Sequence, residues 1–316
     1  MITVLSGGVG AARMLGGVTQ VVKASEVTAI VNVGDDLVLH GLHISPDLDT
    51  ITYTLAGEIN PETGWGLVDE TWNAMSSVQR YGGITWFGLG DRDIGTHLYR
   101  TQRLADGATL TEVTADIVRA WDLKVTLLPV TDDPLRTKVT IRDDDTPPEG
   151  AEIGFQEYFV QRHHDVPVRG VRFEGFETAT PAPGVLAAIA KADVVVIAPS
   201  NPIVSIGPVF AVPGVLDAVR ARRPNVVAVS PIIAGAALKG PADRLLTELG
   251  HEASVVGVAR LYAPAVGTLV IDEADADLAD AVRAEGMRCV VAPTIMRDPL
   301  AAKTLARIAL GAGNQR

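Results

Sequence analysis

Three features of the sequence predict an α/β fold built on a Rossmann-like, doubly wound and mostly parallel sheet. Short apolar runs, rich in β-branched residues, recur at 27–33, 193–198 and 226–229 and are typical of strands that a parallel sheet buries on both faces. Segments of helical character, such as 299–310, lie between or after these runs. The first apolar run, 1–5, leads into a glycine-rich turn, a common strand-to-helix connection in doubly wound sheets.

Composition limits the classes of function. The chain has 316 residues, of which 47% are hydrophobic and 21% charged, an ordinary balance for a globular protein. The formal charge of −11 argues against a general nucleic-acid binder, because phosphate-backbone affinity needs a basic face. No apolar stretch is long enough to span a bilayer, the first residues lack a signal-peptide pattern, and the single cysteine, Cys289, suits a reducing compartment. We therefore expect a cytoplasmic protein without membrane or nucleic-acid partners.

The glycine-rich turn predicts a phosphate site. Gly7, Gly8 and Gly10 allow a tight turn and a close approach of the backbone to a ligand. The next segment, 11–22, can begin a helix whose N-terminal amides attract phosphate. Arg13 occupies the place of the third glycine of the dinucleotide fingerprint, and the Lys-Ser/Thr ending of a P-loop is absent. Arg13 is either a phosphate clamp or a solvated helix residue, so the turn indicates a phosphate or nucleotide ligand and no more.

The stretch 31–50 is the most informative part of the chain, because it gathers acidic and other polar side chains directly after a strand-like run. These residues are Asn32, Asp35, Asp36, His40, His43, Asp47 and Asp49. Buried carboxylates must be paired, hydrogen-bonded or bound to a cation, which suggests a divalent metal beside a phosphorylated ligand. Asp47 and Asp49 share a face if the segment is extended, or lie at the positive end of a helix if Pro46 begins one, and either arrangement can hold Mg²⁺. The alternative is a pair of polar turns that cap helices.

The chain is expected to form a single α/β domain of residues 1–316. Its nucleotide-binding core is assigned to 1–58 and 181–316, and the less regular stretch 59–180 predicts an inserted, mixed α+β subdomain that binds substrate. In the second part of the core, loops after apolar runs carry three candidates for ligand contacts: Ser200, Asn201 and Lys239.

Within the inserted stretch, the apolar spacing of 66–81 predicts an amphipathic helix. Four neighbouring aromatic residues form either a core cluster or a stacking wall for a flat aromatic substrate: Trp65, Trp72, Trp86 and Phe87. The loop 86–97 looks like a site loop because of its glycines and its charged side chains: Asp91, Arg92, Asp93 and His97. The acidic and proline-rich stretch 143–148 is interpreted as a solvated hairpin tip.

Six motifs occur in order along nearly the whole chain. They are Gly7-Gly8-Val9-Gly10, Asn32-Val33-Gly34-Asp35-Asp36, Pro46-Asp47-Leu48-Asp49-Thr50, Gly90-Asp91-Arg92-Asp93 with Thr96-His97, Ala198-Pro199-Ser200-Asn201-Pro202 with Ser205-Ile206-Gly207-Pro208, and Ser230-Pro231-Ile232 with Lys239-Gly240. In this combination the sequence resembles the 2-phospho-L-lactate transferase family, and most closely its actinobacterial phosphoenolpyruvate transferase branch. Six ordered motifs are far more specific than any one of them.

The resemblance implies a Mg²⁺-dependent transferase of coenzyme F(420) biosynthesis. The acceptor would be the deazaflavin precursor Fo (7,8-didemethyl-8-hydroxy-5-deazariboflavin), and the donor enolpyruvyl-diphospho-5'-guanosine, or its lactyl counterpart in archaeal relatives. The terminal ribityl hydroxyl of Fo would attack the distal phosphorus, so that GMP leaves and dehydro-F(420)-0, or F(420)-0, is formed. The expected partners are these small molecules and a second copy of the chain in a homodimer.

The resemblance also assigns expected roles. Asp47 and Asp49 would bind Mg²⁺, and Asp35 or Asp36 would orient or deprotonate the attacking hydroxyl, with His40 less favoured. The catalytic set is therefore Asp35, Asp36 and Asp49. The glycine loop, Asn201 and Lys239 would hold the guanosine diphosphate, and 86–93 would contact Fo. The full set of expected substrate-binding residues is Gly7, Gly8, Gly10, Arg13, Asn32, His40, Trp86, Asp91, Arg92, Asp93, His97, Ser200, Asn201 and Lys239.

Two alternatives remain at this point. The UDP-sugar-binding gluconeogenesis factors are similar in the glycine turn and in 32–36, and they bind nucleotide as regulators without transferring phosphate; the loop 86–97 counts against them. A nicotinamide dehydrogenase would use the same sheet, but the incomplete fingerprint and the surplus of carboxylates count against it. The choice between an enolpyruvyl and a lactyl donor is left open by the sequence.

Overall fold

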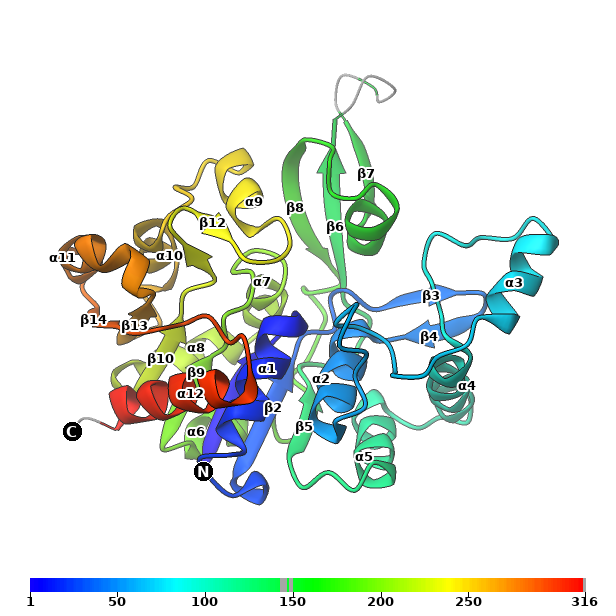
Figure 1. The fold of residues 1–316 in the computed structure, drawn as a ribbon, viewed down its shortest axis with the longest axis horizontal. Helices are drawn as coiled ribbons and strands as arrows, with labels where there is room; N and C mark the ends of the chain where they lie inside the picture. The colour runs from blue at the N-terminus through cyan, green and yellow to red at the C-terminus, as the bar shows by residue number, and fades with distance from the viewer. Residues whose placement is uncertain (143–146, 148–149, 315–316) are drawn as a thin grey trace.

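The structure, a computed structural model, describes residues 1–142, 147 and 150–314. Within these residues, seven strands pair in parallel to form the central sheet (Figure 1). In chain order they are β1 (Ile2–Ser6), β2 (Val27–Val31), β5 (Thr126–Pro129), β9 (Val194–Ile197), β10 (Val226–Val229), β13 (Thr268–Ile271) and β14 (Arg288–Val291). The spatial order β14-β13-β10-β9-β1-β2-β5 confirms the predicted doubly wound fold. All residues of β1, β2, β9, β10 and β13 are buried, as expected for strands covered on both faces.

The chain leaves the middle of the sheet in two directions. β1 is followed by α1 (Gly8–Val18) and β2 on one side, and β9 by α7 (Ile206–Ala211), α8 (Val215–Arg220) and β10 on the other. Because such crossovers are right-handed, α1 and α8 cover opposite faces of the sheet. The loops after β1 and β9 meet where the strand order reverses, which is the place where doubly wound sheets bind ligands.

The C-terminal helix α12 (Pro299–Gly313) packs beside α1 (Figure 1). The two backbones approach so closely that a Cβ on Gly17 would lie 2.3 Å from the carbonyl oxygen of Ala302. Glycine is therefore required at this helix crossing. The other helices of the C-terminal half are α6 (Val185–Lys191), α9 (Ala242–Glu248), α10 (Val255–Tyr262) and α11 (Ala279–Ala284).

Two additions rise from the carboxyl ends of the strands (Figure 1). Between β2 and β5 lie the hairpin β3 (Leu37–Leu39) and β4 (Leu42–Ile44), followed by α2 (Pro46–Ala56), α3 (Asn73–Arg80), α4 (Asp91–Ala105) and α5 (Leu110–Ala120). Between β5 and β9 lies a small antiparallel sheet of β6 (Arg136–Ile141), β7 (Ala151–Gly154) and β8 (Val168–Glu174). The short hairpin β11 (Ile232–Ile233) and β12 (Ala236–Ala237) follows β10.

The stretch 59–180 contributes one strand, β5, to the central sheet, where it pairs with β2. The additional structure therefore enters the fold in two pieces, before and after β5. The division into a core of 1–58 and 181–316 and one inserted subdomain stays a prediction.

The expected helix over 66–81 is wrong in its first half. Only Asn73–Arg80 is helical, because left-handed backbone at Gly66 and Asp69 (φ 70° and 55°) interrupts the apolar pattern. The interpretation of 143–148 as a hairpin tip lies outside the described residues, apart from Pro147.

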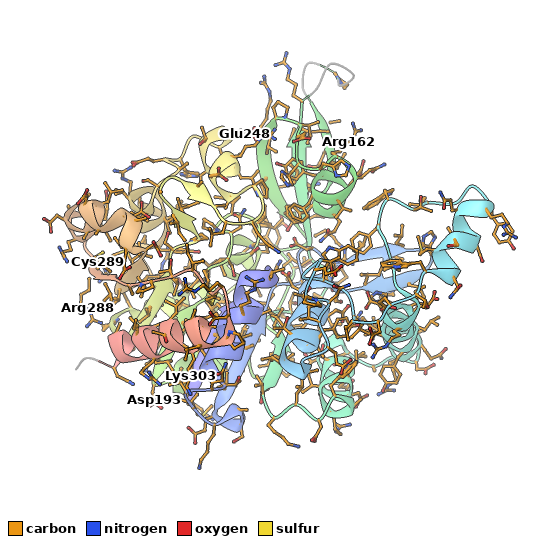
Figure 2. All side chains as sticks on the ribbon, in the orientation of Figure 1. Arg162, Asp193, Glu248, Arg288, Cys289 and Lys303 are labelled. Atoms are coloured by element: carbon orange, nitrogen blue, oxygen red, sulfur yellow. The ribbon has the colours of Figure 1, made fainter. Side chains whose placement is uncertain are left out.

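Cys289 lies on β14 at the outer edge of the sheet (Figure 2). It is half-buried against the core, and burial raises the pKa of its thiol, which fits a structural residue rather than a nucleophile. Across 1–142, 147 and 150–314, none of the helices has the combination of length and apolar character that crossing a bilayer requires.

Candidate functional site

The glycine loop is shaped by its contact with the loop after β9. A Cβ on Gly7 would lie 2.7 Å from Cβ of Ser205, and a Cβ on Gly10 would lie 2.4 Å from the carbonyl oxygen of Pro199. Gly8 has left-handed backbone (φ 74°) and open space around its Cα. The loop leads into the N-terminus of α1, where the first amides of a helix have no intrahelical acceptor. These amides and the helix dipole make the place suitable for an anion.

Asp47 closes the other side of this loop. It stands in the first turn of α2, and its Oδ1 accepts a hydrogen bond from the amide of Gly8 (2.7 Å). Its Oδ2 accepts from the amide group of Asn32 (2.9 Å), whose own oxygen accepts from the N–H of Gly34 (2.8 Å). Burial nevertheless raises the pKa of Asp47 to about 6, so the site favours a neutral or cation-bound carboxylate.

Asp35 and Asp36 lie in the turn that follows β2, which we name the acidic turn. Burial and repulsion from Asp47 and Asp36 raise the pKa of Asp35 well above its usual range. Burial likewise raises the pKa of Asp36 to about 7. Ser45 donates a hydrogen bond to Asp36 Oδ2 (2.7 Å). Oδ1 of Asp35 and Oδ1 of Asp36 are shielded from solvent and have no hydrogen-bond partner in the part of the chain that the structure describes.

Asp49 points away from Asp47, toward α4. Successive helix residues are rotated by about 100°, so positions i and i+2 face nearly opposite directions. The guanidinium of Arg100 donates to both oxygens of Asp49, with Arg100 Nη1 to Asp49 Oδ2 at 3.1 Å. Both side chains are buried, and Asp49 holds the pKa of Arg100 above its ordinary value although burial opposes the charge. Asp47 and Asp49 therefore have different partners: Asp47 faces the glycine loop and Asn32, whereas Asp49 faces Arg100.

His97 and Asp93 extend this contact between the two helices. Nδ1 of His97 lies 3.7 Å from Asp49 Oδ2, and Nε2 lies 3.4 Å from Asp93 Oδ2. The hydroxyl of Tyr53 donates to Asp93 Oδ1 (2.6 Å). Burial opposes the charge of Asp93, yet the close approach of the His97 imidazole holds the pKa of Asp93 below the usual value. Ligand atoms of Asp49, Asp93 and His97 lie within 4.8 Å of one another, so this group could hold a metal.

A cavity of about 330 Å³ adjoins the acidic turn. It is bounded by the β3–β4 hairpin, α4 and the loop after β5, with apolar walls that include Leu37 and Leu104. Its charged side chains are three carboxylates and two guanidinium groups: Asp36, Asp132, Asp133, Arg100 and Arg136. A mixed lining of this kind suits an organic molecule that carries polar substituents.

Asp91 and Arg92 are engaged with the protein itself. The carboxylate of Asp91 accepts hydrogen bonds from the N–H groups of Asn73 and Ala74 (3.0 Å each) at the start of α3, and the bonds from Thr71 and Ala74 hold its pKa well below the usual range. Arg92 Nη2 forms an ion pair with Glu58 Oε2 (3.3 Å). These two side chains join the start of α3 and the start of α4 to the preceding loop.

Three other expected site residues are exposed or contact other parts of the protein: His40, Arg13 and Trp86. His40 is exposed at the tip of the β3–β4 hairpin, with left-handed backbone (φ 54°), whereas Asp36 and Ser45 join the hairpin at its base. Arg13 is exposed and donates to the carbonyl of Met296 (3.3 Å). Trp86 is half-buried and meets Phe87 edge to face at 5.8 Å between ring centroids.

The loop after β9 is built by its own polar side chains. Ser200 donates to the carbonyl of Gly7 (2.7 Å), which fixes the loop to β1. Asn201 Oδ1 accepts from the N–H of Ile203 (2.9 Å). Lys239 is exposed, and its Nζ would lie 3.3 Å from a Cβ on Gly64, a residue that also approaches Val9 of the glycine loop.

Sequence reasoning missed Tyr53, Arg100 and Arg136. Asp93, His97 and Arg100 recur at the i, i+4 and i+7 spacing of one helix face, and Asp49 and Tyr53 stand four residues apart on α2. This spacing could have identified the facing polar stripes. Arg136 stands out in the sequence as part of a basic pair with Lys138 after the polar loop 131–134, but its place in the cavity depends on the packing of β6.

One protein-family model and several curated proteins match nearly the whole chain. The family model described as 2-phospho-L-lactate transferase CofD matches residues 2–300. Among curated proteins, a phosphoenolpyruvate transferase from Kitasatospora aureofaciens is 45% identical over 318 residues, covering 99% of this chain and 98% of that protein. Phosphoenolpyruvate transferases from Streptomyces coelicolor and Mycobacterium avium are also 45% identical, over 312 and 320 residues, with 95% or more of each chain covered.

Solved structures show the same fold at low sequence identity. A crystal structure of protein BH3568 from Bacillus halodurans superposes with a TM-score of 0.64 at 16% identity and covers 98% of both chains. A second crystal structure, described as a upf0052 family member from the same organism, gives a TM-score of 0.61 at 16% identity, covering 98% of this chain and 99% of that one. At this identity the likeness concerns the fold alone.

Proposed function

The chain belongs to the family of the 2-phospho-L-lactate transferase CofD, and from this premise we propose that it is a transferase of coenzyme F(420) biosynthesis. It would transfer a phosphoenolpyruvyl group from enolpyruvyl-diphospho-5'-guanosine to Fo, giving dehydro-F(420)-0 and GMP. The enolpyruvyl donor is preferred to the lactyl donor because relatives at 45% identity are named phosphoenolpyruvate transferases. The observation that carries the proposal is the match over residues 2–300, which includes the glycine loop and the acidic turn.

The guanosine diphosphate of the donor is assigned to the point where the strand order reverses. The Gly8 N–H is already bound by Asp47, but the amides that follow it at the N-terminus of α1 have no intrahelical acceptor and would face the phosphate oxygens. Lys239 is exposed beside this loop and would contribute a positive charge. Ser200 and Asn201 support the donor indirectly, by holding the loop after β9 against Gly7.

Asp35 and Asp47 fit a divalent cation. Both carboxylates are buried, repulsion from Asp47 helps to raise the pKa of Asp35, and Asp35 Oδ1 has no hydrogen-bond partner among the described residues. We assign Mg²⁺ to this pair, where it would offset the charge of the donor's diphosphate. The expected pairing of Asp47 with Asp49 has less support, because Arg100 already neutralises Asp49. The same neutralisation disfavours an ion at the group of Asp49, Asp93 and His97.

Asp36 is the best candidate for the general base. Its pKa of about 7 suits proton transfer near neutral pH, and it borders the cavity. In the proposed step, the ribityl hydroxyl oxygen forms a bond to the phosphorus that carries the enolpyruvyl group, and its proton passes to Asp36. The bond from that phosphorus to the bridging oxygen breaks, and GMP departs with this oxygen. Alignment and charge neutralisation are what such a transfer needs from the protein.

We further propose that the protein is a homodimer and acts in the cytoplasm. The segment from Trp86 to Asp93 would contact Fo. The UDP-sugar-binding regulator is the less favoured alternative, since the curated relatives above are named as transferases. Sedimentation velocity of the purified chain tests the dimer directly.

The proposed reaction is tested by mass spectrometry of the products. The protein is incubated with Fo and Mg²⁺ and with either the enolpyruvyl or the lactyl guanylated donor. We expect a phosphodiester of Fo and one equivalent of GMP with the enolpyruvyl donor, and a strong loss of product with Asp47→Asn. Absence of product with both donors, together with tight binding of a UDP-sugar, would refute the transferase.

A further inference from the structure

Two tryptophans outside the proposed catalytic group are unusually exposed. Trp65 and Trp72 expose 46% and 43% of their surface, and their rings meet edge to face with centroids 6.4 Å apart and planes at 76°. Burial of such a large apolar side chain is favourable, so a pair left half in solvent needs an explanation. Trp121 provides a contrast, because its ring packs edge to face on the buried Tyr53.

The backbone that carries the two tryptophans is held firmly. The hydroxyl of Thr63 donates to the carbonyl of Trp65 (2.6 Å), and an isolated bridge joins Ile59 to the buried Leu67. Trp72 is the N-cap residue of α3, where Asp91 accepts hydrogen bonds from the residues on both sides of it. The indoles are therefore presented on a fixed support, which lowers the entropy cost of binding a ligand.

Reciprocal capping connects this support to α4. Glu70 accepts hydrogen bonds from the N–H groups of Arg92 and Asp93 (2.8 Å each), just as Asp91 caps α3. Gly88 lies beside the indoles: a Cβ there would make ordinary van der Waals contact, 3.4 Å from Cζ3 of Trp72 and 3.7 Å from Cη2 of Trp65.

The tryptophan pair borders the proposed donor site. A Cβ on Gly64, the residue before Trp65, would lie 3.8 Å from Cγ1 of Val9 in the glycine loop and 3.3 Å from Nζ of Lys239. The segment thus crosses from the glycine loop toward the loop that follows β12. A flat group resting on the indoles would lie next to the phosphates that the glycine loop is proposed to hold.

We propose that Trp65 and Trp72 form the stacking surface that binds the tricyclic aromatic ring of the acceptor, an inference that rests on the proposed function. Indole faces bind flat aromatic rings through apolar contact and ring electrostatics. The guanine of the donor is the other flat group available. The acceptor is the better occupant because strand-end loops of the central sheet hold the nucleotide, while Trp65 and Trp72 stand on the structure added between β2 and β5.

The test compares Trp65→Leu, Trp72→Leu and the double variant with Trp65→Phe and Trp72→Phe. Each leucine variant is expected to raise the KM for Fo about tenfold, with little change in the donor KM, since stacking on one aromatic ring is lost. The phenylalanine variants should keep most of the affinity. Tyr81→Leu is the matched control, because Tyr81 is an aromatic residue at the other end of α3 and is 84% exposed. Its KM for Fo should be unchanged.

Equilibrium binding separates this inference from the reaction. Fo is titrated into each protein without donor, and the quenching of tryptophan fluorescence and the emission of Fo are followed. If the wild-type protein forms no product with either donor but binds Fo more tightly than the leucine variants, the reaction is wrong and the stacking surface stands. An unchanged affinity for Fo in the double variant, or a rise in the donor KM alone, overturns the stacking surface.

Discussion

Asp36 joins the chemistry of the site to the stability of the fold. Its carboxylate lies at the base of the β3–β4 hairpin, where Ser45 bonds one oxygen and the other is shielded from water. Burial raises the pKa of Asp36 to about 7, so the folded chain retains a proton that the unfolded chain releases near pH 4. Between these pH values folding is favoured by acid.

We predict that Asp36→Asn removes part of the pH dependence of stability. The folded pKa of the carboxyl is raised, so its protonated form stabilises the protein below about pH 7, and this contribution is lost as pH rises from about 4 to 7. In urea unfolding with EDTA, the wild-type protein should lose free energy of unfolding from pH 5.5 to 8, by on the order of 1 kcal/mol more than the variant. Parallel pH profiles of the two proteins would contradict the assignment.

Asp49 and Arg100 form a buried charge pair between α2 and α4. Arg100→Met should lower the free energy of unfolding by about 3–5 kcal/mol, because it leaves the carboxylate of Asp49 buried without its cation. The double variant Asp49→Leu with Arg100→Met should cost much less than the sum of the single changes, since an apolar pair can replace a buried ion pair. Urea unfolding of all four proteins in a double-mutant cycle measures the coupling; additive single effects would show that the pair does not act as a unit.

At the scale of elements, two glycines set the position of α1. Gly10 lies against the carbonyl of Pro199 in the loop after β9, and Gly17 against the carbonyl of Ala302 in α12. Gly16, between them in sequence, has nothing within 4 Å of an added Cβ. The helix is therefore wedged between two backbones, and its N-terminus is placed for a phosphate by packing rather than by its own side chains.

These glycines make a matched series of alanine variants. Gly10→Ala should raise the donor KM at least about tenfold and destabilise the protein by roughly 1–3 kcal/mol, because the loop must move away from Pro199. Gly17→Ala should destabilise by a similar amount and leave the donor KM nearly unchanged. Gly16→Ala should stabilise by up to about 1 kcal/mol, as expected for alanine in a helix with free space. Kinetics and thermal unfolding of the three variants check this order.

The start of α3 gives a second prediction for an element. Asp91→Ala removes the acceptor for the N–H groups of Asn73 and Ala74, so the start of α3 should lose local stability. Hydrogen exchange of 73–80 should accelerate while the central sheet keeps its protection. Asp106→Ala, which changes an exposed aspartate at the other end of α4, is the control. Unaltered exchange in 73–80 would argue against the capping role.

At the scale of the whole molecule, a protein of formal charge −11 is proposed to bind an anionic donor beside the buried Asp35 and Asp47 and the partly buried Asp36. The donor and the carboxylates are both negative, so they can lie together only with a cation between them. The strand order brings the glycine loop, Asp35 and Asp47 to one edge of the sheet, where the proposed Mg²⁺ would lie. Nucleotide and Mg²⁺ binding should therefore depend on each other.

We predict that GDP and Mg²⁺ together raise the Tm by several degrees, more than the sum of their separate effects. A ligand present at about 100 times its Kd stabilises the folded state by about 2.7 kcal/mol. UDP with Mg²⁺ should have a smaller effect, and Asp47→Asn should abolish the increment that Mg²⁺ adds to GDP. An equal shift with UDP would instead favour the nucleotide-binding regulator.

The sequence by itself determined the class of fold and the set of loops that meet at one edge. Continuous apolar runs specify parallel strands buried on both faces, and the ligand-binding edge follows from strand direction, so Gly7, Gly10, Asp35 and Asp47 could be grouped without coordinates. These signals are local, because they depend on residues that are neighbours in the chain.

Only the tertiary structure decided which carboxylates share a partner and which aromatic rings are presented to solvent. Asp47 and Asp49 are two residues apart, but the helix that contains them turns one toward the glycine loop and the other toward Arg100, 51 residues further along the chain. Trp65 and Trp72 are brought beside Gly88 by capping between two helices. Pairings of this kind depend on contacts distant in sequence, whose geometry is fixed by packing and not by any local pattern.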